Sequence, residues 1–242
     1  MKSNRYRIAN KVVEINSIYD EVHKYCAEYQ TEDIADYSIT ITQEDIEFEK
    51  HKYVNEKRIE GSPIEHYPDS YFEELASYRK IAEKMLDYDT ILFHGSAVSV
   101  NGEGYLFTAK SGTGKSTHTK LWCEYFKNKA TMVNDDKPLI HISDKITVYG
   151  TPYNGKHRIG CNISVPLKSI CILTRATENS IKEVTKHEAY PMLIQQVYRP
   201  EDITKMKKTL NLIDNLVDNV KFYILGCNTD ISAAKIAYEG MR

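Results

Sequence analysis

The chain has 242 residues, and its 32 Lys and Arg against 34 Asp and Glu give a net charge of −2. Hydrophobic residues make up 41% of the chain, which excludes a disordered protein, and the balanced charge argues against a protein that coats nucleic acid or an anionic membrane. No apolar run is long enough to span a bilayer, and residues 1–11 lack the apolar core of a secretory signal, so we expect a cytoplasmic protein without a nucleic-acid or membrane partner. The five cysteines form no CxxC pair, so neither a zinc site nor a redox motif is predicted.

The first 70 residues are predicted to form a small α+β lobe. Ser17 is a candidate cap for a helix that runs to Tyr29. Apolar and polar residues alternate over residues 39–42 and again over residues 46–49, which predicts two short strands.

Residues 50–70 combine glycine and proline with many charged residues, which predicts a loop and a domain boundary. The N-terminal lobe then comprises residues 1–70 and the core comprises residues 71–242. All recognisable phosphate chemistry lies in the core, so we expect the lobe to recognise an acceptor or partner.

The core is predicted to alternate strands with helices. Helices are expected at 72–86, 115–125, 189–197, 206–220 and 231–238, and strands at 91–93, 98–100, 105–108, 131–133, 139–142, 146–149, 169–173 and 222–225. Asn101-Gly102 joins two of these strands and favours a hairpin, because both residues tolerate positive φ. Pro191 is compatible only with the first turn of its helix. Hairpins together with crossover helices indicate an α/β fold with a mixed β-sheet and flanking helices.

Residues 109–117 have the sequence AKSGTGKST and lie between a predicted strand and a predicted helix, which is the setting of a phosphate-binding P-loop. Gly112 and Gly114 allow backbone amides to approach phosphate oxygens, and the helix N-terminus adds unpaired N–H groups. Lys115 is expected to reach the β- and γ-phosphates and the Ser116 hydroxyl to bind Mg²⁺. The residues predicted to bind the nucleotide are Ser111, Gly112, Thr113, Gly114, Lys115, Ser116 and Thr117. The alternative is a Gly/Ser linker before an ordinary helix, and the segment begins with alanine where such loops usually have a glycine.

Asp135 and Asp136 follow the predicted strand at 131–133, so both carboxylates are expected at the carboxyl end of a strand, where ligands of α/β sheets collect. One carboxylate would hold Mg²⁺ and the other would accept the proton of an attacking hydroxyl. The metal site is therefore predicted at Ser116, Asp136 and Asp135. The alternative interpretation is a simple turn, because Asn and Asp favour turns before the Lys-Pro that follows.

Three further side chains are candidate catalytic residues. His94 follows a strand predicted beside the P-loop strand, where it would contact a phosphate or tune the acidic pair, or simply pack in the fold. Lys156 and Arg158 lie in a turn-rich segment and would neutralise charge on a transferred phosphoryl group, unless they belong to a solvated hairpin. His118 and Trp122, one turn apart on the helix after the loop, are interpreted as packing residues.

A His-Gly-Ser segment, a P-loop ending in Gly-Lys-Ser and an Asp-Asp pair after a hydrophobic strand follow one another along the chain. This order resembles the HPr kinase/phosphorylase and phosphoenolpyruvate carboxykinase superfamily. The resemblance implies a carboxykinase-type P-loop fold, with Lys115 and Ser116 at the phosphate and metal positions. It also implies Asp135 as the general base, Asp136 as the second carboxylate and His94 as the active-site histidine.

The resemblance is strongest over residues 91–142. Within the superfamily the chain is most similar to the short HPr-kinase-like proteins of bacterial gene clusters, some of which are associated with modified peptides. Thr117 stands where HPr kinases commonly have glutamate, and in this the chain is similar to carboxykinases. The segment that supports phosphorolysis in HPr kinases has no counterpart in the sequence.

The predicted function is that of a Mg²⁺-dependent kinase that transfers the γ-phosphoryl group of ATP to a Ser or Thr hydroxyl of a protein or peptide. The catalytic residues are predicted to be Asp135, Lys115, His94, Lys156 and Arg158. Two alternatives stay open, a kinase of small-molecule hydroxyls and a nucleotide-gated binding module without transfer activity. The sequence also leaves open whether the chain is a monomer or a homo-oligomer.

Overall fold

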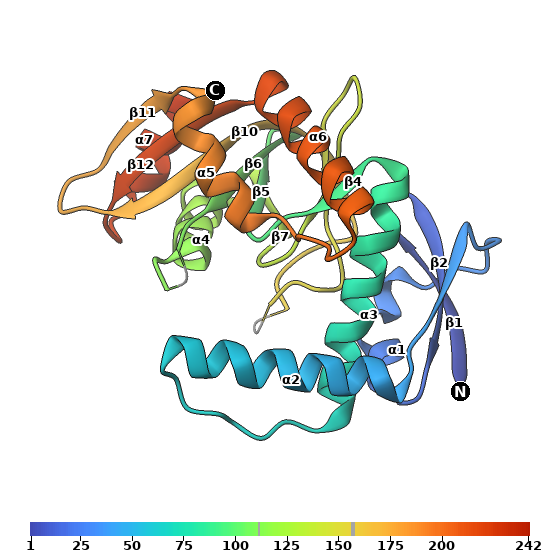
Figure 1. Cartoon of the computed structure of the whole chain (residues 1–242). Helices are drawn as coiled ribbons and strands as arrows, with labels where there is room; N and C mark the ends of the chain where they lie inside the picture. Colours follow the sequence, from blue (N-terminus) through green and yellow to red (C-terminus); the bar gives the residue numbers. More distant parts are fainter. Residues whose placement is uncertain (111, 156–157) are drawn as a thin grey trace. The chain divides into compact units, whose positions relative to one another are not determined.

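The computed structural model describes residues 1–110, 112–155 and 158–242 (Figure 1). The chain divides into two compact units, Met1–Lys84 and Met85–Arg242. The second unit contains residues 109–117, the predicted phosphate loop, and the acidic pair Asp135 and Asp136, and each unit has its own sheet.

The boundary between the units falls at the end of helix α3 (Asp69–Met85), whereas the sequence predicts it at residue 70. The helix itself is predicted correctly, but it is tied to the first unit. The buried carboxylate of Glu73 accepts the backbone N–H of Ile18 at 2.5 Å and that of Tyr19 at 2.9 Å. Because these bonds satisfy the carboxylate within the first unit, α3 belongs there and not to the core.

The first unit is a small three-stranded sheet with helices. Its strands are β1 (Lys2–Ile8), β2 (Lys11–Ser17) and β3 (Tyr37–Thr40), with β1 antiparallel and β3 parallel to β2. Its helices are α1 (Glu21–Tyr25), the 3₁₀ turn η1 (Ala27–Tyr29), α2 (Gln43–Glu60) and α3. Ser17 is the last residue of β2 and not a helix cap, since its hydroxyl donates to the Tyr19 carbonyl at 2.7 Å.

The strand predicted at residues 46–49 is wrong, because these residues lie in α2. Thr42 and Asp45 form a capping box in which each side chain accepts the other's backbone N–H, and this local signal starts a helix. The helix continues into the segment predicted as a loop at residues 50–70 and ends at Gly61, whose φ of 64° suits a left-handed C-cap.

The second unit is built on a large mixed sheet, as the sequence predicts. From one edge the strands run in the order β4 (Thr90–Leu92), β8 (Leu139–His141), β9 (Thr147–Tyr149), β10 (Ser164–Arg175), β6 (Glu103–Thr108), β5 (Ser96–Val100) and β7 (Ala130–Asn134), and β12 (Lys221–Cys227) pairs with both β10 and β11 (Ser180–Val184). The strand β10 is parallel to β6 and to β12, while β5 is antiparallel to both β6 and β7. The strands β6, β7, β10 and β12 therefore run in the same direction and end at one edge of the sheet.

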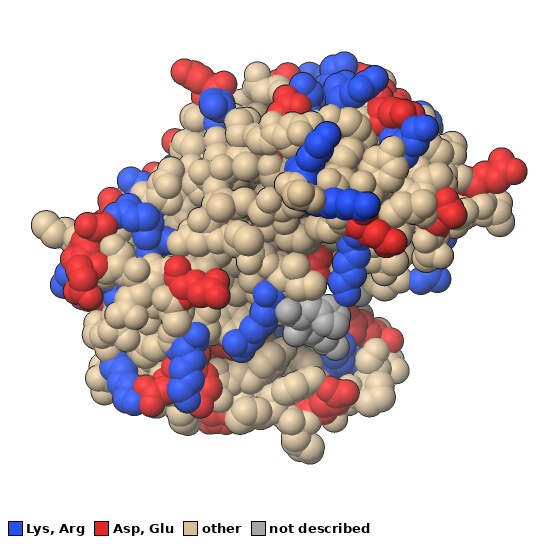
Figure 2. All heavy atoms as spheres, turned by 180° about the vertical axis from the view of Figure 1, so that it is seen from behind, with Lys and Arg blue, Asp and Glu red and all other residues tan. Residues whose placement is uncertain are grey.

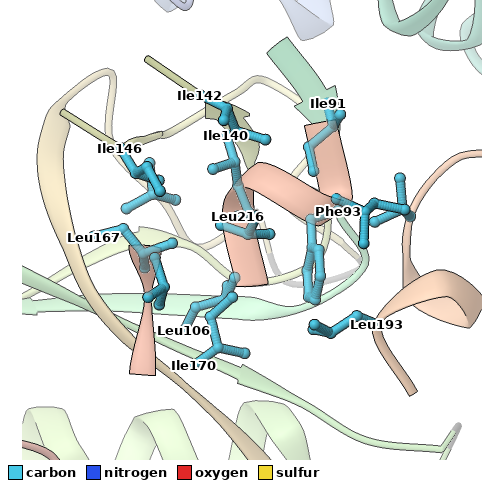
Figure 3. Close-up of a cluster of buried hydrophobic side chains, with 14 of the residues drawn as sticks. Ile91, Phe93, Leu106, Ile140, Ile142, Ile146, Leu167, Ile170, Leu193 and Leu216 are labelled. Atoms are coloured by element: carbon cyan, nitrogen blue, oxygen red, sulfur yellow. The ribbon is translucent and has the colours of Figure 1, made fainter. Parts of the chain in front are cut away.

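Helices cover both faces of this sheet. They are α4 (Lys115–Phe126) and α7 (Ser232–Met241) on one face and α5 (Lys186–Gln196) and α6 (Ile203–Asn219) on the other, with short 3₁₀ turns η2 (Leu86–Tyr88) and η3 (Lys127–Lys129). Along β10, Ile170 and Ile172 join the apolar cluster under α5 and α6, while Cys171 and Leu173 join the cluster under α4 and α7. This alternation follows from the two-residue period of a strand, and Figure 3 shows part of the first cluster.

Helix α5 begins earlier than predicted, and Pro191 therefore lies inside it. The cause is a capping box between Thr185 and Glu188, which starts the helix at Lys186. The proline removes one intrahelical hydrogen bond, and the burial of Ala189 and Leu193 in the core offsets that loss.

Charged side chains of both signs are interspersed on the face of the molecule in Figure 2. Within the described ranges, no helix combines the length and the apolar composition that a membrane span requires.

The buried His118 of α4 generates a prediction about stability. Its Nε2 accepts the indole N–H of Trp122 at 3.0 Å, and burial lowers its pKa from 6.5 to about 4. Between these two pH values the unfolded chain binds a proton that the folded chain does not, so the free energy of unfolding should fall by about 3 kcal/mol as the pH drops from 6.5 to 4. Denaturant titrations across this range measure the loss. In His118→Gln, which retains an acceptor but does not titrate, the loss should be smaller by that amount, and equal losses in both proteins would contradict the prediction.

Candidate active site

The phosphate loop connects β6 to α4, in the predicted strand–turn–helix order. Gly112 has a φ of 74° and Gly114 a φ of 115°, values that favour glycine, and α4 begins directly afterwards at Lys115. The first N–H groups of this helix have no intrahelical partners and are available to an anion. Ala109, at the usual position of the first glycine, is buried in the apolar cluster under α4, which explains how its methyl group is accommodated. The predicted nucleotide-binding residue Ser111 lies outside the described residues.

Asp135 directly follows β7, and its side chain lies beside the predicted phosphate loop. Only 6% of Asp135 is exposed, and the buried Ser96 hydroxyl donates to its Oδ1 at 2.8 Å and its backbone carbonyl at 2.9 Å. The hydroxyl of Ser116, in the first turn of α4, lies close enough to the carboxylate to lower its pKa. Burial raises the pKa of Asp135, and the two hydroxyls oppose that shift. The acidic residue and the predicted metal-binding hydroxyl therefore lie close together.

Asp136 lies on the more open side of the acidic pair, beside His94. The His94 Nε2 is 3.5 Å from the Asp136 Oδ1, and both side chains are partly exposed. Burial and the neighbouring Lys115 lower the pKa of His94, although Asp136 acts in the opposite direction, so His94 is neutral at pH 7. Burial also lowers the pKa of Lys115, and both carboxylates counteract this. The structure thus brings together Lys115, Ser116, Asp135, Asp136 and His94, all of them predicted site residues.

Asn134 fixes the backbone that presents the two carboxylates. Its buried Oδ1 accepts the N–H of Asp136 at 2.9 Å and that of Lys137 at 2.7 Å. Its Nδ2 donates to the Thr151 hydroxyl at 2.9 Å. The segment does form a turn, as the alternative interpretation expects, and this turn positions both carboxylates.

The segment of His94 is held by two further residues that the sequence interpretation did not identify as functional. The N–H of His94 donates to the Gln196 backbone carbonyl at 2.7 Å. The N–H of Gly95 donates to the Asp136 carbonyl at 2.9 Å. A Cβ atom at Gly95 would lie 2.8 Å from the Phe107 carbonyl oxygen, so this close approach requires glycine.

The structure describes one of the two basic residues predicted to act in the 150–158 segment. Lys156 lies outside the described residues. Arg158 is exposed, in a loop whose Gly155 packs against Asp136, since a Cβ atom at Gly155 would lie 3.1 Å from the Asp136 Cβ. The loop therefore touches the acidic pair, while Arg158 itself is solvent-exposed.

Arg175, at the end of β10, is a cation that the sequence interpretation missed. Its Nη2 donates to the Gly112 carbonyl at 2.6 Å, which fixes the orientation of a peptide in the phosphate loop. Its position could have been inferred only from the strand arrangement, because β10 is parallel to β6 and ends at the same edge of the sheet.

The donor atoms of the site fit a magnesium ion that binds together with a nucleotide. Among the described residues, no group of three or more His, Cys, Asp or Glu could hold a metal ion alone. Mg²⁺ is usually bound by one or two carboxylates, with substrate phosphates and water completing the shell. Ser116, Asp135 and Asp136 supply such an oxygen-only set.

Comparison with known families identifies the chain. Residues 74–231 match the family described as SynChlorMet cassette protein ScmC, which is more than half of the chain. The chain therefore belongs to this family. No curated protein matches it. Among solved structures, the Hpr(Ser) kinase/phosphatase from Coxiella burnetii is similar with a TM-score of 0.33 and 8% identity, over 61% of this chain and 94% of that chain. A likeness of this size supports no conclusion about function, which rests on the site geometry instead.

Asn134 provides a test of how the acidic pair is positioned. Asn134→Ala leaves the N–H groups of Asp136 and Lys137 without their acceptor, so the free energy of unfolding should fall by about 1–3 kcal/mol for each buried group left unsatisfied. Denaturant unfolding measures this loss. Thr131→Ala, at an exposed position of the same strand, is the matched control and should change stability by less than about 0.5 kcal/mol. Equal effects of the two substitutions would show that the Asn134 side chain does not hold the turn.

Proposed function

We propose that this member of the ScmC family is a Mg²⁺-dependent kinase with a carboxykinase-type P-loop fold. It transfers the γ-phosphoryl group of ATP to a serine or threonine hydroxyl of a protein or peptide. The observation that carries this proposal is the closeness of Ser116, in the predicted phosphate loop, to the buried Asp135 at the end of β7, whose pKa the Ser116 hydroxyl lowers. Phosphoryl transfer requires the nucleotide phosphates and a carboxylate at one place, and this closeness supports that arrangement.

In this proposal the phosphate loop binds the donor. Its backbone N–H groups and Lys115 hold the phosphates, while the carbonyl of Gly112 stays turned away toward Arg175. Ser116, Asp135 and Asp136 would hold Mg²⁺, which when bound neutralises charge on the transferred group.

Asp135 acts on the acceptor. It takes the proton of the acceptor hydroxyl as the hydroxyl oxygen attacks the γ-phosphorus, and the bond to the bridging oxygen of the departing ADP breaks. Burial raises the pKa of Asp135, which suits a proton acceptor that works near neutral pH. His94, whose Nε2 lies 3.5 Å from the Asp136 Oδ1, would help to position the second carboxylate.

The first unit is the proposed recognition element for the acceptor. None of the site residues lies in Met1–Lys84, and the family match begins only at residue 74. The resemblance to HPr kinases, whose acceptor is a protein, supports a protein or peptide hydroxyl over a small molecule.

The direct test is transfer from γ-labelled ATP in a lysate of the source organism, followed by mass spectrometry of the labelled species. Label on a Ser or Thr of a protein or peptide, dependent on Mg²⁺ and absent with Asp135→Asn, is the expected result. Label on a metabolite would support a small-molecule kinase. Nucleotide binding without transfer to any acceptor would support a binding module.

Lys115→Ala should weaken ATP binding by about 1–3 kcal/mol, the size of a lost charge-assisted contact. Calorimetry with ATP and Mg²⁺ measures the change. Lys120→Ala removes the same charge from an exposed position of the same helix and should have a much smaller effect. Equal affinities for wild type and Lys115→Ala would refute the phosphate site.

Asp135→Asn should impair transfer more than binding, because a general base acts in the transition state while the loop holds the ground-state nucleotide. We expect kcat to fall by roughly 10²–10⁴-fold with a small change in ATP affinity. Asp136→Asn should mainly raise the Mg²⁺ concentration that transfer requires. Single-turnover transfer and nucleotide titration of both variants separate the two roles. Wild-type transfer by Asp135→Asn would remove Asp135 from the mechanism, and interchanged effects of the two variants would exchange their roles.

A further inference from the structure

A cavity of about 440 Å³ lies beside the predicted phosphate loop and extends beyond the residues assigned above to the phosphates. One wall comes from Gly112 and Gly114 of the loop and from Thr117 in the first turn of α4. The other wall comes from the ends of two parallel strands, Arg175 and Ala176 at the end of β10 and residues 227–229 at the end of β12. The cavity is therefore continuous with the predicted phosphate site and lies where α/β sheets collect their ligands.

The lining of this cavity suits a neutral, partly aromatic group attached to phosphates. Leu121, Ala176 and Cys227 offer apolar surface, while Thr117 and Thr229 offer hydroxyl groups. Among the described residues that line it there is no carboxylate, so nothing in this part of the wall repels a polyanion. Its volume lies within the range of small-ligand sites.

His118 in the cavity wall leaves one buried donor unsatisfied. The indole N–H of Trp122 occupies the His118 Nε2, so the neutral ring carries its proton on Nδ1. His118 is 2% exposed, and its Nδ1 has no hydrogen-bond partner within the described part of the chain. A buried donor without a partner is unfavourable, and an acceptor brought by a ligand, directly or through a water, would satisfy it.

We propose that this cavity binds the nucleoside of the phosphoryl donor. The base lies against the apolar wall, and the sugar hydroxyls and base nitrogens meet Thr117, Thr229 and the donor of His118. The donor is then selected as a nucleoside triphosphate over an inorganic polyphosphate, which a phosphate loop alone does not distinguish. The inference rests on the proposed function, because it assumes that the loop holds phosphates.

The test compares two ligands that share the triphosphate, ATP and inorganic tripolyphosphate, each with Mg²⁺ in calorimetry. Wild type should bind ATP at least tenfold more tightly than tripolyphosphate. Ala176→Trp places a large side chain at an exposed position of the cavity wall, so ATP affinity should fall at least tenfold while tripolyphosphate affinity stays within twofold. Thr177→Trp, on the neighbouring exposed residue outside the lining, should change neither affinity.

A second measurement uses wild type alone and does not depend on how a variant folds. The half-buried thiol of Cys227 lines the cavity, so saturating ATP should slow its alkylation by iodoacetamide severalfold, as followed by peptide mass spectrometry. Saturating tripolyphosphate should leave that rate unchanged.

The outcomes separate this inference from the proposed function. Equal wild-type affinities for ATP and tripolyphosphate, equal weakening of both by Ala176→Trp, or equal protection of Cys227 by both would overturn the nucleoside site while leaving the phosphate site intact. Failure of wild type to bind either ligand would overturn the phosphate site, and the inference with it.

Discussion

The active site depends on a buried carboxylate that has to be satisfied. Removing an ionised carboxylate from water is costly unless donors replace the lost hydration, and Asp135 is almost completely buried. The Ser96 hydroxyl at the start of β5 donates to it, and the Ser116 hydroxyl in the first turn of α4 lies close enough to lower its pKa. The same requirement that stabilises Asp135 therefore places a hydroxyl of the phosphate loop against the acidic pair.

The sheet topology makes these contacts geometrically available. Because β5 is antiparallel to both of its neighbours, β6 and β7 end at the same edge as the one where β5 begins. The phosphate loop follows β6, the acidic pair follows β7 and His94 precedes β5, so three segments meet there. The strands β10 and β12 end at that edge too and bring Arg175 and Cys227 to the other side of the loop. One strand arrangement thus produces both the phosphate site and the cavity beside it.

How much of the structure the sequence could predict depended on how far apart the interacting residues lie along the chain. The Asn101-Gly102 hairpin, the strand–loop–helix of the phosphate loop and the strand before the acidic pair follow from neighbouring residues, and all are present. The contacts of Ser96, Arg175 and Gln196 join residues far apart in the chain, so no local pattern indicates them. The error over residues 46–49 is different, since apolar alternation was given more weight than the capping box at Thr42, which determines the helix.

The charges around the acidic pair indicate why metal and nucleotide should bind together. Lys115 and Lys137 lie near two carboxylates, and His94 is neutral, so these groups sum to about zero when both carboxylates are ionised. A triphosphate adds several negative charges to this balanced set, and Asp136 would then repel the γ-phosphate that Lys115 attracts. A divalent cation between the carboxylates and the phosphates would remove that repulsion, as it does in nucleotide-dependent phosphotransferases. Each ligand therefore supplies the charge that the other needs, and we expect Mg²⁺ and nucleotide to increase each other's affinity by the same factor.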